Sequence, residues 1–366
     1  MGKVLKELYL HGNFKELSLL IDKEYKIESL DDDRLLFLGK VKDKLGQMSD
    51  LENMINELKT RKSIMDDDSK AVRFALLCAR MHYHRGDYDE ANEILGSVKK
   101  GSTLLNQRGF IGELFFELAK ISLVQGRTPD AESNFYKSLN YFDIQNHATQ
   151  IIAVYHWLAK NSIQLMQINS VNKYLTLVNE LIELINSQYL KAWYENTKSE
   201  YFVLKGDLKS AEKHVNKATS IHLRLTASPL NLWHDYKVSG QIQLLNGNWD
   251  KAYDLFFKAE NQQTMLCGDR NISESRLLRL FIESKFNYSD AIRQLKDVTK
   301  MSEMSQSRFG LSNFLLNAAL VIFSKTFIEK EKGTGELQRL VVGTENILIK
   351  NAAQNLLRTG KVSGIF

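Results

Sequence analysis

Few residue pairs in this chain have types and a spacing that could support chemistry. His82 and His84 form a His-x-His pair, which could bind a metal ion from one face of a strand. On a helix the two side chains would point about 200° apart and could not share a metal. Glu113 and Glu117 are spaced i,i+4, so they share a helical face in the way that a metal-binding or acid–base carboxylate pair does. The surrounding helical pattern favours an exposed surface position for both.

The sequence contains no established catalytic or nucleotide-binding motif. GxGxxG, GxxxxGK[ST], HExxH and GxSxG are all absent, and the 20 glycines are mostly single residues at expected turns. The sequence therefore predicts a protein that is not an enzyme and that has no cofactor and no metal site.

Composition indicates an all-α protein. Of the 366 residues, 43% are hydrophobic and 25% are charged, and there are only two prolines. These values are typical of a globular protein without long Pro-rich linkers. The net charge of +5 is spread along the chain, whereas a nucleic-acid binder more often has a clustered basic stripe. The acidic runs 31–33 and 66–68 are expected to be solvated turns that cap helices.

The sequence also bears on the cellular compartment. The two cysteines are far apart in the sequence, which favours a reducing compartment over a disulfide framework. The N-terminal residues lack the apolar run of a secretory signal, and no stretch of about 18 apolar residues could span a bilayer. A cytoplasmic protein without a membrane segment is expected.

A repeat with a period of 40 residues organises the chain. Small residues recur at positions 39, 79, 119, 159, 199 and 240. In most copies a glycine follows about seven residues later, and then an alanine or another apolar residue. This order predicts a helix that ends at a left-handed glycine and a second helix that crosses the first closely. One such hairpin cannot bury its apolar face alone, so the hairpins must stack.

The segments GDYDEANEIL (86–95), GDLKSAEKHVNKA (206–218) and GNWDKAYDLFFKA (247–259) resemble the second half of the tetratricopeptide repeat, or TPR. The resemblance covers about residues 1–300 and implies an α-α superhelix of seven to eight helical hairpins over 1–306. The standard unit has about 34 residues. The longer period is similar to that of extended repeats in bacterial regulators, such as peptide-sensing phosphatase inhibitors and the sensor domain of maltose-type transcription activators.

The last 60 residues depart from the repeat. Residues 307–324 are predicted to form one apolar helix, and Gly333-Thr334-Gly335 interrupts the pattern that follows. A helix that ends at Gly360, followed by a short extended piece, fits a helical cap over 307–366. It also resembles a fragment of a winged helix. The sequence leaves both alternatives open.

In TPR proteins the first helix of each hairpin lines the concave face. The resemblance therefore implies a partner-binding face made of cations, aromatic residues and amides: Arg73, Arg80, Tyr83, Phe116, Lys120, His156, Lys160, Trp193, Asn196, His234, Lys237 and Gln241. The cations would form a basic stripe that suits an extended peptide with carboxylates. They could equally be long side chains on a solvated wall.

These observations predict a bacterial cytoplasmic scaffold or adaptor that binds a protein or peptide in its groove. The alternative is the sensor domain of a transcription regulator, with DNA contact through the C-terminal region or through a further domain. Nucleic acid is possible as a partner but is not favoured. A homodimer through the apolar helix at 307–324 is compatible with either function.

Overall fold

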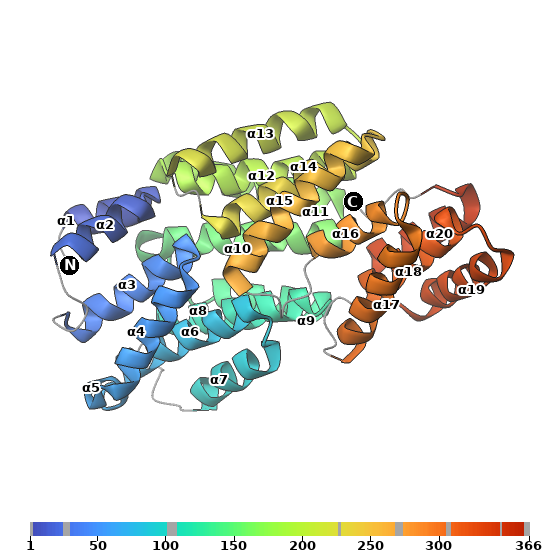
Figure 1. The fold of residues 1–366 in the computed structure, drawn as a ribbon. Coiled ribbons are helices and arrows are strands. Elements are labelled where there is room, and N and C mark those ends of the chain that lie inside the picture. The colour runs from blue at the N-terminus through green and yellow to red at the C-terminus, as the bar shows by residue number, and fades with distance from the viewer. Residues whose placement is uncertain are drawn as a thin grey trace.

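The structure is a computed structural model that describes residues 3–24, 30–100, 108–225, 228–267, 274–304, 309–344 and 346–361. These residues form twenty helices and no strand, as the composition and repeat predicted (Figure 1). Sixteen helices pair into eight successive hairpins: α1 (Lys3–His11) with α2 (Phe14–Glu24), α3 (Asp32–Leu45) with α4 (Met48–Thr60), α6 (Asp68–Arg85) with α7 (Tyr88–Lys100), α8 (Arg108–Val124) with α9 (Thr128–Leu139), α10 (Ile144–Gln164) with α11 (Ile168–Ile185), α12 (Gln188–Leu204) with α13 (Leu208–Leu225), α14 (Pro229–Leu245) with α15 (Trp249–Cys267), and α16 (Glu274–Glu283) with α17 (Tyr288–Met304). The short α5 (Lys62–Met65) lies between the second and third hairpins, and α18 (Phe309–Phe323), α19 (Phe327–Gly343) and α20 (Ile347–Thr359) complete the array.

The turn within most hairpins uses the predicted left-handed residue. Gly86 has φ +83° and its N–H caps the end of α6, and equivalent glycines with positive φ follow α3, α8, α12 and α14. Glycine adopts this conformation at little cost because it has no Cβ. In the fifth hairpin the equivalent residue is Met166, with φ 56°. The helix starts also agree with the prediction, because Asp31 and Asp67 cap α3 and α6.

The small residues of the repeat lie where the two helices of a hairpin cross. Ala79, Ala119 and Ala159 are fully buried. The hydroxyl of Ser199 on α12 donates to the carbonyl of Ala211 on α13 at 2.7 Å, which shows how closely these backbones approach. A Cβ on Gly240 would lie 2.7 Å from the ring of Phe256. The small slot therefore sets the crossing distance.

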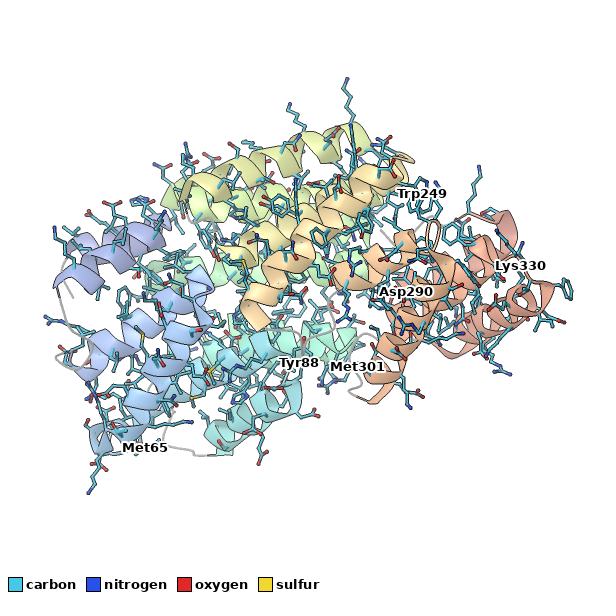
Figure 2. The ribbon with its side chains drawn as sticks, in the orientation of Figure 1. Met65, Tyr88, Trp249, Asp290, Met301 and Lys330 are labelled. Carbon is cyan, nitrogen blue, oxygen red and sulfur yellow. The ribbon has the colours of Figure 1, made fainter. Side chains whose placement is uncertain are left out.

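The C-terminal helices pack directly on the array. Phe314, Leu315 and Leu320 of α18 are buried in one core with residues of α15, α16, α17, α19 and α20. The apolar face of α18 is thus covered within the chain, and a homodimer through this helix has no support in the structure. Trp249, which is labelled in Figure 2, begins α15. Its ring contacts Phe323 of α18, with 6.0 Å between centroids, and so joins the last repeats to these helices.

The expected interruption at Gly333-Thr334-Gly335 is wrong, because α19 runs through it as one helix. A Cβ on Gly333 would lie 2.9 Å from the carbonyl oxygen of Asn317, so this glycine permits close contact between α19 and α18. The helix predicted to end at Gly360 is present, and Gly360 caps α20 with φ +68°. The short extended piece expected after it lies outside the described residues. The boundary at 306/307 stays a prediction.

The superhelix is tight enough that distant repeats touch. The ring of Phe14 on α2 contacts Tyr189 on α12 edge to face, with 4.9 Å between centroids. The hydroxyl of Ser228, which precedes α14, donates to the carbonyl of Lys44 on α3 at 3.1 Å. The first two hairpins therefore pack against the sixth and seventh, and the array closes on itself.

No helix among the described residues has the length and apolar character needed to cross a membrane.

Candidate functional site

The closed superhelix surrounds a channel of about 1060 Å³. Its wall is formed mainly by the first helices of the hairpins, α3, α6, α8, α10, α12, α14 and α16, with further residues from the N- and C-terminal helices. A volume of this size lies at the upper end of the range for ligand pockets, about 300–1,000 Å³. The channel is the candidate functional site.

Ten of the twelve residues predicted for the concave face line this channel: Arg80, Tyr83, Phe116, Lys120, His156, Lys160, Trp193, His234, Lys237 and Gln241. The other two lie elsewhere. Arg73 pairs with Asp33, whose side chain is largely exposed, at the outer end of α6. Asn196 is buried between helices and donates to Oδ1 of Asp235 at 2.8 Å. Whether the ten bind a partner stays a prediction.

Arg80 is the centre of a buried ion network. Its Nε donates to Glu117 Oε1 at 2.7 Å, and its Nη2 donates to Glu113 Oε2 at 3.0 Å. Lys40 on α3 contacts Glu113 at 3.2 Å, and Lys120 contacts Glu117 at 2.6 Å. The expectation that Glu113 and Glu117 are exposed is therefore wrong. Glu113 contacts cations of α3 and α6, whereas Glu117 contacts Arg80 of α6 and Lys120 of its own helix, so both carboxylates are paired where they are buried.

The network fixes the charge states of its members. Burial would raise the pKa of Glu113, but Lys40 and Arg80 together lower it to about 2. Burial would lower the pKa of Arg80, but Glu117 and Glu113 raise it instead. Glu113 and Arg80 therefore stay charged at neutral pH, and breaking their contact would leave a buried charge without compensation.

A second set of ion pairs joins the inner helices of the later repeats. Lys160 on α10 donates to Glu200 on α12 at 2.7 Å. Lys237 on α14 lies 3.9 Å from Glu200 and 3.3 Å from Glu274 on α16. The prediction of a basic stripe is therefore corrected. Carboxylates from neighbouring helices alternate with the cations, so the wall carries both charges. The wall suits a polar ligand more than a strongly acidic one.

Neutral aromatic side chains occupy the middle of the wall. Two imidazoles flank Trp193, with centroid distances of 5.0 Å to His156 and 6.1 Å to His234. Burial, and then the charge of Lys160, lowers the pKa of His156 well below its ordinary value of 6.5. Burial, Lys160 and Lys237 do the same to His234. Both rings are therefore neutral at physiological pH, which favours aromatic or amide contacts with a ligand.

The His-x-His pair has two unrelated sets of contacts. His84 Nε2 lies 2.9 Å from Oδ1 of the buried Asp43, whereas His82 Nδ1 lies 3.5 Å from Asp87 in the turn after α6. No group of three potential metal ligands occurs among the described residues.

Sequence reasoning missed four residues that complete the wall, namely Lys40, Asp43, Glu117 and Glu274. The repeat slots place Glu113 and Glu200 on the inner face, but neither was predicted to bind a partner. The repeat itself held a signal for some of them. Residues about one period apart often contact each other, as in Arg73 with Asp33, His84 with Asp43 and Lys160 with Glu200. A search for oppositely charged or hydrogen-bonding residues 40 or 41 positions apart would have found these pairs.

The chain has the fold of TPR-like helical-repeat proteins. It is similar to a Rap protein complexed with Competence and Sporulation Factor, with a TM-score of 0.61 and 13% identity over 89% of this chain and 92% of that one. It is also similar to NprR in complex with its cognate peptide NprX, with a TM-score of 0.56 and 12% identity over 90% of this chain and 99% of that one. A chain of the APC/C hetero-tetramer Cut9–Hcn1 gives a TM-score of 0.58 and 18% identity over 86% of this chain and 54% of that one. No family model and no curated protein sequence matches the chain.

Proposed function

We propose that the protein is a non-enzymatic peptide-binding scaffold that holds an extended peptide in its central channel. The observation that carries the proposal is the channel itself, which is enclosed by seven inner helices and lined by aromatic rings and ion pairs. An extended chain needs such a surface, where apolar pockets alternate with hydrogen-bonding groups. One of the similar structures holds its cognate peptide, NprX, and another is a complex with Competence and Sporulation Factor, which supports a binding role for this channel.

The proposal includes a role as a cytoplasmic regulator of bacterial type. Peptide binding between the inner helices would change how the first two hairpins pack against the sixth and seventh, because the contacts of Tyr189 and Ser228 join these parts beside the channel. A change in curvature would then report the bound state to a second protein. No observation favours DNA contact through the C-terminal region, since α18–α20 pack as helices on the array.

Affinity selection from a synthetic random hexapeptide library, read by mass spectrometry, tests the proposal. Thr149→Trp adds bulk at a half-buried position in the channel wall. Thr176→Trp is the matched control, because Thr176 is exposed on the outer helix α11. We expect the wild type and the control to retain peptides and Thr149→Trp to lose at least about tenfold of that retention, which corresponds to about 1.4 kcal/mol. Equal retention by both variants would move the site off the channel.

A further inference from the structure

The outer face of α19 is exposed and carries apolar residues at both of its ends. Phe327 and Ile328, at the start of the helix, are 78% and 77% exposed, and Val342, near its end, is 86% exposed. Figure 1 shows α19 at the edge of the molecule. Single exposed apolar residues are common on protein surfaces, so these residues are informative only if they belong to one face of the helix.

Three positions on this face repeat every seven residues. Ile328, Gly335 and Val342 lie within about 40° of one another around the helix axis and span about 21 Å along it. We call these three residues the outer seam. The buried residues of α19 lie about half a turn away from it, on the side that packs against the chain: Gly333, Leu337 and Leu340. A seven-residue repeat is the pattern by which one helix contacts another, so the outer seam is shaped to receive a helix.

Gly335, at the centre of the outer seam, has no packing role within the described chain. A Cβ built on it would meet no atom within 4 Å, whereas a Cβ on Gly333 would lie 2.9 Å from the carbonyl oxygen of Asn317 on α18. A glycine inside a helix reduces its stability relative to alanine, because glycine loses more backbone freedom on folding. At Gly333 the close approach of α18 offsets this loss. A second helix that crosses the outer face at Gly335 would offset it in the same way.

One side of the outer seam is basic. Lys325, Lys332 and Arg339 are also spaced seven residues apart, and each precedes a member of the seam by three residues. All three are exposed, and neither lysine contacts a carboxylate among the described residues. Arg339 contacts Glu336 at 2.6 Å, yet its side chain stays 79% exposed. Glu331 is the one acidic residue on the other side of the seam, so the charge around the seam is mainly positive.

We infer that α19 is a docking surface for a helix of another protein, one with apolar residues along its contact face and acidic residues beside them. The seam supplies apolar contact, Gly335 lets the two backbones approach, and the basic side pairs with the acidic residues. A second copy of this chain fits poorly, because antiparallel packing would bring Lys332 of one copy beside Arg339 of the other. The inference does not depend on the ligand of the channel, since no residue of α19 lines it.

Fluorescence anisotropy with two labelled synthetic peptides tests the inference. Both peptides have leucine at positions a and d of three heptads, and they differ only at positions e and g, which hold glutamate in one and lysine in the other. We expect the full chain to bind the glutamate peptide at least about tenfold more tightly, which corresponds to about 1.4 kcal/mol, and added salt to weaken this binding. Equal binding of the two peptides, or binding of neither, would overturn the inference.

Substitutions on α19 locate the bound peptide. Lys332→Glu should weaken binding of the glutamate peptide about tenfold, and Glu331→Gln should tighten it. Gly335→Trp fills the crossing point and should abolish binding. Gly96→Trp is its matched control, because Gly96 is also a helical glycine whose Cβ would meet no atom within 4 Å, on the distant helix α7. Unchanged binding by Lys332→Glu and Gly335→Trp would place the peptide elsewhere and overturn the inference.

Two controls accompany these titrations. Circular dichroism verifies that each variant keeps the helix content of the wild type, and Lys332→Glu, at an exposed position, decides the matter if Gly335→Trp does not fold. Sedimentation velocity measures self-association of the chain. A dimer that Lys332→Glu strengthens would assign the outer seam to a second copy and overturn the inference.

Discussion

Along α3, α6 and α8, every two successive cations of the channel wall have a buried carboxylate of the chain between them. Along α8 and α10, the same register positions hold Lys120 and Lys160 with no such bridge among the described residues. The sequence pattern of the two regions is alike, since each places a long cation at the same position of the inner helix. The tertiary surroundings differ.

The difference shows that cations at the same register position take part in different contacts. A cation removed from water is costly unless it is paired. Arg80 contacts two carboxylates and is 10% exposed, so its charge is used within the fold. Lys120 contacts Glu117 on its own helix and lies over the ring of Tyr83 on α6, whereas Lys160 contacts Glu200 on α12. The N-terminal network therefore joins α3, α6 and α8, and the later pairs join α10 to the helices that follow it.

Removal of Arg80 should have the largest effect on stability. Arg80→Met leaves Glu113 and Glu117 buried with one cation fewer, which should reduce the free energy of unfolding by about 3–5 kcal/mol. Arg73→Met, on the same helix, breaks a pair with the exposed Asp33 and should cost only about 0–1 kcal/mol. Urea denaturation of both variants measures the difference. Equal losses would show that the first network is not structural.

The free energy of unfolding at acid pH should depend on the same network. The pKa of Glu113 is about 2 in the folded protein against an ordinary value of 4.5, so the unfolded chain binds more protons between these values. Stability should therefore fall as the pH drops below about 4.5, with a slope of up to about 1.4 kcal/mol per pH unit from this group. Glu113→Gln should give a flatter curve over that window when unfolding is measured by urea at each pH. A curve of unchanged slope would contradict the assignment.

His156, in the middle of the wall, should affect the free energy of unfolding over a separate and higher pH range. Because the pKa of His156 is lowered in the folded protein, the unfolded chain takes up a proton first as the pH falls through 6.5. Stability should decline from about pH 7 towards pH 5, and His156→Gln should remove part of that decline. The same substitution should leave the loss of stability below pH 4.5 unchanged. If it altered only that loss below pH 4.5, the two regions would not titrate independently.

The sequence alone predicted stacked helical hairpins with a 40-residue period, and these features follow from local chemistry. The residues of the concave face came instead from the resemblance to TPR proteins, and ten of the twelve line the channel. A glycine that adopts positive φ ends a helix, and a small residue such as Ala79 permits a close crossing. The 3.6-residue period then decides which side chains share the inner face. Because the pattern recurs six times, each copy supports the others.

Only the tertiary structure decided how the charges on that face are used. A helical pattern places Glu113 and Glu117 on one face but does not say whether that face meets water or the Arg80 of another repeat. It also cannot show that the rotation accumulated over several hairpins brings Phe14 against Tyr189 and encloses a channel. Both outcomes depend on the angle between successive repeats, which is set by packing across the whole array. That angle determines which buried charges are paired within the chain and which side chains line the channel.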